Sequence, residues 1–277
     1  MADKVCMWKG ETDGRFTKSH YWDPVAMETA RNVRVCYKDA VTLFRMNDLG
    51  FRSLQDRDYS RPLAVVWGDS VVFGQGRRTW VDMLEKFCPS IQFFNGGVEG
   101  IRFHELVDLM ERRNAEIAID HNVTLPGWHG WQGWDRDLGL WKRVADLPGP
   151  MFVTMPSLLN ELTIKEDWTS YILPSAGGSR ERPGNAHLEG CLRRFWGNDD
   201  FHATAAKHLD KILKRNEVCR RAAEALDVPL CNMWAGMAVN TLAQGVPYFQ
   251  DMGHPEPDAY PWMAEILWRS LKHELDC

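Results

Sequence analysis

Residues 63–70, LAVVWGDS, decide the fold class of this chain. The apolar run that opens the stretch is too short for a helix and stops at Gly68, which is typical of a strand buried on both faces of a parallel sheet. Pro62 lies immediately before the run and marks its beginning. The pattern therefore predicts a buried strand that delivers Asp69 and Ser70 to its carboxyl end.

Helix and strand patterns alternate along the rest of the chain. Trp80, Met83, Leu84 and Phe87 recur at helical spacing, and a second strand is predicted at residues 91–94, before the turn Asn95-Gly96-Gly97. Further strands are predicted at residues 122–125, 151–155 and 228–231, and further helices at 103–110, 209–226 and 263–271. This order predicts an α/β fold, a flavodoxin-like three-layer α/β/α sandwich around a five-stranded, mostly parallel sheet that binds ligands at the carboxyl ends of its strands.

Three stretches do not fit this alternation. Residues 1–60 are polar and without a sustained period, and we expect them to form an N-terminal extension packed on the core. Residues 61–277 are expected to form a single domain, within which the stretches at about 128–150 and 156–204 are too long for ordinary connections. We expect these two stretches to be insertions that cover the site.

The charge balance argues against a nucleic-acid partner. The 277 residues include 33 Lys and Arg against 38 Asp and Glu, a formal net charge of −5, and no basic run suggests a phosphate-binding surface. The chain opens without the apolar stretch of a secretory signal, and no segment reaches the roughly 18 apolar residues of a membrane span. We therefore expect a cytoplasmic protein. Its seven cysteines form no CxxC pair, which favours reduced thiols.

Gly68-Asp69-Ser70 suggests a nucleophile. Where a strand turns into a helix, the Oγ of Ser70 would face the crevice and its N–H could donate to an oxyanion. The alternative is structural, because small and capping residues are common at any turn from strand to helix. The tripeptide alone does not separate the two interpretations.

Asp251-Met252-Gly253-His254-Pro255, ahead of the last predicted helix, suggests the partners of that serine. A carboxylate three residues before an imidazole can hold its Nδ1 and leave Nε2 free to take a proton from a serine hydroxyl. The alternative is a capping aspartate followed by a surface histidine. The spacing predicts Ser70, Asp251 and His254 as a catalytic set.

These elements, in the order Ser, Asp, His, resemble the SGNH/GDSL hydrolase family, serine esterases with an early Gly-Asp-Ser block and an Asp-x-x-His near the C-terminus. Residues 95–100, NGGVEG, are similar to the family's second block, whose final glycine, here Gly100, donates its N–H to the oxyanion. A strand-ending turn explains the same residues equally well. Residues 47–52, NDLGFR, resemble a segment that precedes the nucleophile strand in many bacterial members, so the resemblance runs from about residue 45 to the C-terminus.

The third block of that family departs from its pattern. The family has Gly-x-Asn-Asp there, and the Asn is the third oxyanion donor; here the place is taken by residues 126–130, PGWHG, with His129 at the Asn position. We expect His129 to donate to the oxyanion together with Ser70 and Gly100, the alternative being an exposed loop histidine. A literal Gly197-Asn198-Asp199 follows the fourth strand, where Asp199 or Asp200 would cap the next helix. If Asn198 instead reaches the pocket, it replaces His129 as the donor.

The first of the two expected insertions is strongly aromatic. Trp128, Trp131 and Trp134, with Trp141 beyond them, lie at or after the end of a strand, where tryptophan can stack on sugar rings. The first three are therefore candidate substrate-binding residues, and a carbohydrate-linked ester is the candidate substrate. Their spacing fits equally well with tryptophans that pack over their own insertion.

The sequence contains no motif for a cofactor or a metal. Gly74-Gln75-Gly76 lacks the third glycine of a dinucleotide site, and the chain has no HExxH, CxxC or EF-hand pattern. The prediction is a serine esterase or O-deacetylase that acts on a small-molecule or carbohydrate ester. Two alternatives stay open: an O-acyltransferase that uses a sugar hydroxyl as acceptor, and a non-catalytic glycan-binding protein that keeps the fold.

Overall fold

The chain folds around a parallel sheet. The computed structural model describes residues 4–6, 22–23, 28–31, 33–36, 43–74, 78–130, 133–157, 201–244, 249 and 253–275. The sheet has five strands in the order β10-β9-β8-β6-β7, and every pairing is parallel. Its strands are β6 (Leu63–Gly68), β7 (Gln92–Gly97), β8 (His121–Thr124), β9 (Pro150–Val153) and β10 (Leu230–Cys231). The predicted α/β fold with a five-stranded sheet is confirmed.

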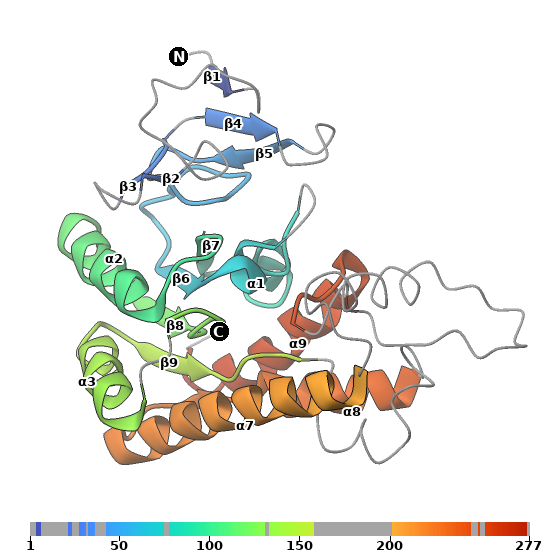
Figure 1. Ribbon diagram of the computed structural model, residues 1–277. Helices are drawn as coiled ribbons and strands as arrows, with labels where there is room; N and C mark the ends of the chain where they lie inside the picture. The colour runs from blue at the N-terminus through green and yellow to red at the C-terminus, as the bar shows by residue number, and fades with distance from the viewer. Residues whose placement is uncertain are drawn as a thin grey trace, which may run out of the picture.

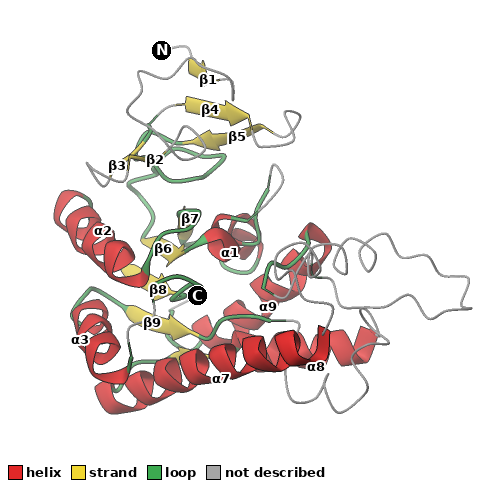
Figure 2. Cartoon of the chain, in the orientation of Figure 1, coloured by secondary structure: helices red, strands yellow, loops and turns green. Residues whose placement is uncertain are grey.

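Helices cover both faces of this sheet (Figures 1 and 2). One face carries α2 (Phe103–Glu116), α3 (Trp134–Ala145) and α7 (Phe201–Leu226), whose buried side chains join one apolar cluster. The other face carries η1 (Val81–Lys86), α8 (Met233–Gln244) and α9 (Tyr260–Leu271), which join a second cluster. The short helices α1 (Ser70–Phe73) and η2 (Pro257–Ala259) complete the fold.

Strand β6 divides its side chains between the two clusters. Leu63, Val65 and Trp67 lie in the cluster under α2 and α7, whereas Ala64 and Val66 lie in the cluster under α9. All five are at most 1% exposed. Side chains of a strand alternate between its faces, so a continuous apolar run is what two covered faces require.

Some elements differ from those predicted. The segment after Thr79 forms a 3-10 helix, and β7 continues through Gly97 rather than ending before Asn95. Glycine is needed inside β7, because a Cβ at Gly96 would lie 2.5 Å from Cε3 of Trp67. Helix α8 was not predicted, since it is apolar on most sides and shows no helical period.

The expected insertion at 128–150 contains an ordinary crossover helix. Helix α3 connects β8 to β9 and buries Trp141 and Val144 against the sheet. Its high content of Trp, Gly and charged residues disguises the helical pattern. Of the second expected insertion, at 156–204, residues 158–200 lie outside the described part of the chain.

The N-terminal region adds a smaller group of strands. Strand β4 (Val33–Cys36) pairs in parallel with β1 (Lys4–Cys6) and antiparallel with β5 (Leu43–Met46), and β2 (Trp22–Asp23) pairs with β3 (Glu28–Thr29). These strands lie beyond β7 and α1 in Figure 1. Phe44, Met46 and Phe51 enter the same apolar cluster as Trp67, so residues 43–51 pack on the main sheet.

The cysteines with described side chains are buried and differ in their redox state. Cys219 and Cys231 are free and buried, as expected of structural thiols. The expectation of reduced thiols does not hold for Cys88, which is disulfide-bonded to a cysteine whose side chain lies outside the described ones. Among the described residues, no helix combines the length and the apolar character that crossing a bilayer requires.

Candidate active site

Three connections leave the sheet side by side at its carboxyl edge. The register pairs Gly68 of β6 with Gly97 of β7, and Trp67 of β6 with Thr124 of β8. Backbone hydrogen bonds extend both pairings past the strand ends: the Val98 N–H donates to the Gly68 carbonyl and the Leu125 N–H to the Trp67 carbonyl, each at 2.9 Å. The turn after β6, the turn after β7 and the loop after β8 therefore start from one edge.

Ser70 is the first residue of helix α1 in the turn after β6. Asp69 caps this helix, because its Oδ1 accepts a hydrogen bond from the Val71 N–H at 3.0 Å. The capping interpretation of this tripeptide therefore applies to Asp69 and leaves the Ser70 hydroxyl for another partner. Gly97 allows α1 to lie directly on β7, because any Cβ there would overlap the backbone of Phe73.

The other end of α1 is held by two buried polar side chains. Asn95 donates from Nδ2 to the Val72 carbonyl at 2.7 Å. Arg52 donates from Nη1 to the carbonyls of Phe73 and Gly74 at 2.5 and 2.7 Å, with its guanidinium 4.4 Å from the centre of the Phe73 ring. Carbonyls at a helix end need such donors when water is excluded. The sequence pointed to Arg52 through the NDLGFR segment but not to this role.

Ser70 and His254, 184 positions apart, meet at this edge. The Ser70 Oγ lies 2.7 Å from the His254 Nε2. The histidine sits on a loop closed by a backbone bridge between Phe249 and Pro255. Asp251, the third member of the predicted set, lies outside the described residues.

Trp128 supports the histidine loop from the side. A Cβ on Gly253, the residue before His254, would overlap the indole of Trp128, so only glycine lets the ring lie against this backbone. Gly253 is buried and Trp128 is partly buried against the cluster under α9. The indole that we considered as a sugar platform thus packs on the histidine loop.

The loop after β8 is fixed to the turn that carries Ser70 by Asp69. Its Oδ2 accepts a hydrogen bond from the Trp128 N–H at 2.6 Å. The preceding Gly127 has φ +75°, and a Cβ there would lie 2.8 Å from the Asp69 carboxyl carbon. Arg215 of α7 donates to the Gly127 carbonyl at 3.1 Å. Sequence reasoning missed Arg215, which is one of six Lys or Arg residues in α7.

His129 and Gly100, the two further expected oxyanion donors, lie on neighbouring connections. The His129 carbonyl accepts from the Phe103 N–H at 3.2 Å, which ties the loop after β8 to the start of α2. The His129 side chain is exposed. Gly100, with φ +66°, follows the turn after β7 and stands in the left-handed region that favours glycine.

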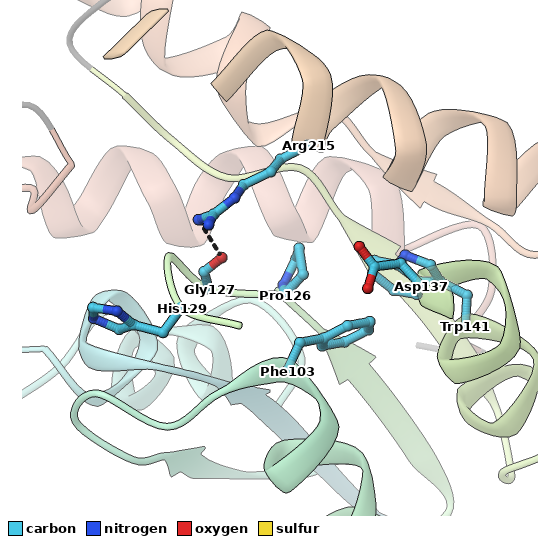
Figure 3. A pocket seen from close by; sticks show the side chains of 7 residues that line it. All are labelled: Phe103, Pro126, Gly127, His129, Asp137, Trp141 and Arg215. Atoms are coloured by element: carbon cyan, nitrogen blue, oxygen red, sulfur yellow. Dashed lines mark hydrogen bonds between the residues drawn. The ribbon is translucent and has the colours of Figure 1, made fainter. Parts of the chain in front are cut away.

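A small pocket, partly open to solvent, lies beside this loop (Figure 3). It is lined by Phe103, Pro126, Gly127, His129, Asp137, Trp141 and Arg215. Figure 3 shows the His129 imidazole on the side opposite Asp137 and Trp141, and Arg215 reaching down to the Gly127 carbonyl. The pocket is therefore bounded by α2, α3, α7 and the loop after β8.

The charges around the pocket have opposite signs. Burial lowers the pKa of Arg215, and the nearby carboxylates of Asp69 and Asp137 act in the opposite direction. An arginine stays protonated in a protein, so these carboxylates compensate a cation that is partly withdrawn from water. No group of three or more potential metal ligands occurs among the described residues.

The remaining candidates are only partly placed. Trp131 lies outside the described residues, as does the side chain of Trp134. Trp141 is 2% exposed and packs between Phe103 and Phe152, with ring centres 4.7 and 4.2 Å away. Asn198, the alternative oxyanion donor, also lies outside the described part of the chain.

The comparisons with known proteins identify the fold. No protein-family model matches the chain, and no curated protein matches it significantly in sequence. Among solved structures, a lipase/acylhydrolase from Enterococcus faecalis is 13% identical, with a TM-score of 0.52 and coverage of 78% of this chain and 97% of that one. A GDSL-like lipase from Bacteroides thetaiotaomicron is 16% identical, with a TM-score of 0.50 and coverage of 80% and 93%.

An acetylxylan esterase from Geobacillus stearothermophilus is similar to the same extent, with 13% identity, a TM-score of 0.50 and coverage of 76% of this chain and 94% of that one. The matches span most of the chain, and at these identities they establish a shared fold. The resemblance to the SGNH/GDSL fold is thereby confirmed.

Proposed function

We propose that the chain is a serine hydrolase that cleaves a carboxylic ester, with Ser70 as the nucleophile. The observation that carries the proposal is the 2.7 Å separation of the Ser70 Oγ and the His254 Nε2. A serine hydroxyl becomes a useful nucleophile when a base within hydrogen-bond reach can accept its proton. The fold shared with GDSL lipases and esterases adds support.

The proposed reaction has two halves. Ser70 Oγ attacks the ester carbonyl carbon while its proton passes to His254 Nε2, and the imidazolium then returns that proton to the departing alcohol. Water next attacks the acyl-enzyme, losing a proton to His254, which returns it to Ser70 as the acid leaves. Asp251 is assigned the task of holding the imidazole Nδ1, on the spacing of its motif alone.

The negative charge that develops on the carbonyl oxygen needs donors. We assign these to the N–H groups of Ser70 and Gly100 and to the side chain of His129. The start of all three connections from one sheet edge supports this grouping. Removal of a single oxyanion donor from a hydrolase typically lowers kcat by about 10²- to 10³-fold, so the loss of the His129 donor should have an effect of this size.

For the substrate we propose a small acyl group carried on a carbohydrate. The acetylxylan esterase among the structural neighbours has this chemistry, which makes acetylated sugars the first substrates to assay. The support does not come from Trp128, whose ring packs on Gly253.

Labelling with a fluorophosphonate probe tests the function. We expect the wild-type chain to be tagged and Ser70→Ala to remain untagged, because the probe requires an activated serine. The same pair of proteins is assayed with p-nitrophenyl acetate, on which Ser70→Ala should lose about 10³-fold or more in kcat/KM. A folded wild-type chain that is neither tagged nor active would refute the hydrolase and favour the glycan-binding alternative.

A further inference from the structure

One peptide group in the loop after β8 is held at both of its polar ends. The Trp128 N–H, which donates to Asp69 Oδ2, and the Gly127 carbonyl, which accepts from Arg215, belong to the same peptide unit. The structure has no cis peptide bond among its described residues, so this N–H and this carbonyl point in opposite directions. Asp69 therefore lies on the N–H side of this peptide, and Arg215 lies on its carbonyl side.

The signs of the two charges match the peptide dipole. A peptide unit is positive at its N–H end and negative at its carbonyl oxygen. The Asp69 carboxylate faces the positive end and the Arg215 guanidinium faces the negative end. If the peptide turned over, its carbonyl would face the carboxylate and its N–H would face the guanidinium. The two charges thus favour one orientation and oppose the other.

The peptide needs such a restraint because a glycine precedes it. Gly127, with φ +75°, occupies backbone space that other residues rarely adopt, and glycine leaves the following peptide unusually free to rotate. Burial strengthens the restraint: Asp69 is fully buried and Arg215 is partly withdrawn from water, so neither charge is screened as it would be at the surface.

We propose that Arg215 is a positioning residue that, with Asp69, locks the Gly127–Trp128 peptide and so sets the place of His129. This inference rests on the proposed function, in which His129 donates to the oxyanion. His129 follows the locked peptide directly, and its own carbonyl is held by the Phe103 N–H.

The lock itself is tested without reference to catalysis. In Arg215→Met, which removes both the charge and the donor, the Trp128 amide should exchange with deuterium at least about 10-fold faster than in the wild type. Peptides from β6 should exchange at the same rate in both proteins. The matched control is Arg220→Met on the same helix, which removes an exposed arginine paired with Glu217 and Glu224 and should leave the loop unchanged.

The effect on catalysis is tested through His129. Arg215→Met should lower kcat about 10- to 100-fold with little change in KM, because a displacement of about 1 Å at a reacting group has effects of that size. Arg215→Lys, which keeps the charge and one donor, should recover most of the loss. In a His129→Ala background, Arg215→Met should cause no further loss of kcat, since it acts through the side chain already removed.

The outcomes separate the two proposals. A wild-type chain that the fluorophosphonate leaves untagged refutes the hydrolase, while the exchange experiment still judges the lock. A tagged and active chain in which Arg215→Met exchanges and turns over like the wild type overturns the positioning role. Equal losses of kcat from Arg215→Met with and without His129 overturn it as well. If Arg215→Met does not fold, Arg215→Ala, which also removes the charge and the donor, takes its place in every comparison.

Discussion

The turn after β6 and the loop after β8 leave the same sheet edge one strand apart, yet they are held in different ways. The turn carries helix α1, whose two ends are fixed by Asp69, Asn95 and Arg52, all buried. The loop is held by single hydrogen bonds to Trp128, Gly127 and His129, and the His129 side chain is exposed.

The two regions should therefore respond differently to substitution. Around α1 the polar groups are buried within the apolar core, so a substitution there should affect the stability of the whole fold. Along the loop after β8 the polar groups are held by single hydrogen bonds, so a substitution there should shift the geometry of the site while the sheet stays folded. The turn that carries Ser70 is thus tied into the core, whereas the loop after β8 is tied to its neighbours by single hydrogen bonds.

The strongest challenge to this comparison is Arg52→Met. It would leave the buried Gly74 carbonyl without its Arg52 donor and the Phe73 carbonyl with only the Asn95 donor at 3.3 Å, and we expect the free energy of unfolding to fall by about 3 kcal/mol. Urea denaturation measures the loss. The control is Arg269→Met, which removes a 70% exposed side chain paired with Glu265 and should cost less than about 0.5 kcal/mol. Equal losses in the two variants would contradict the view that α1 belongs to the core.

Gly253→Ala tests whether the close packing of the histidine loop on Trp128 positions His254. The new methyl group would overlap the Trp128 indole and push His254 away from Ser70, so kcat should fall about 10- to 100-fold. Gly253→Ala combined with Trp128→Ala should recover part of this loss, because the overlap is then removed. Gly139→Ala, where a Cβ meets open space in α3, is the control and should keep full activity. Steady-state kinetics that give no recovery in the double variant would count against the packing argument.

The smallest expected effect concerns His121, at the start of β8 and away from the carboxyl edge of the sheet. It should change the stability of the fold without changing the site. Burial lowers the pKa of His121 from its ordinary value of 6.5, against the opposing charge of Asp120. The unfolded chain therefore binds more protons here, and the stability contributed by neutral His121 is present above that value and lost as the pH falls through and below it. Urea midpoints at pH 8 and pH 5.5 should differ more for the wild type than for His121→Asn.

The raised pKa of Asp82, which arises from its own burial, acts equally in both proteins and cancels in that difference. A wild type and His121→Asn with the same pH dependence would show that the imidazole is protonated freely in the folded state.

The parts that the sequence predicted well are those in which a local pattern has one physical solution. A short apolar run such as β6 can be buried on both faces only in a covered sheet, and Gly-Asp-Ser with Asp-x-x-His named the pair Ser70 and His254 that the structure brings together. The five strands of the main sheet were predicted in their order along the chain, whereas strands β1–β5 and helices α3 and α8 were not.

The parts that escaped prediction depend on register between distant elements. Helix α7 contains six basic residues, and only its placement on the sheet decides that Arg215 is the one that meets the Gly127 carbonyl. Helix α8 buries Met233 and Met237 but leaves Val239 56% exposed, so its apolar residues do not follow one face. The role of Trp128 could not be inferred, because its contact, Gly253, lies 125 positions further along the chain.

The contact of Arg52 with the end of α1 bears on where the folded domain begins. The strand pattern places the start of the domain at residue 61, but a protein shortened to that point would lack the guanidinium of Arg52, which donates to the end of the Ser70 helix, and the Phe44 ring beside that guanidinium. The segment from residue 43 onward is therefore part of the support of the Ser70 helix, and a shortened chain that keeps this helix in place has to include it.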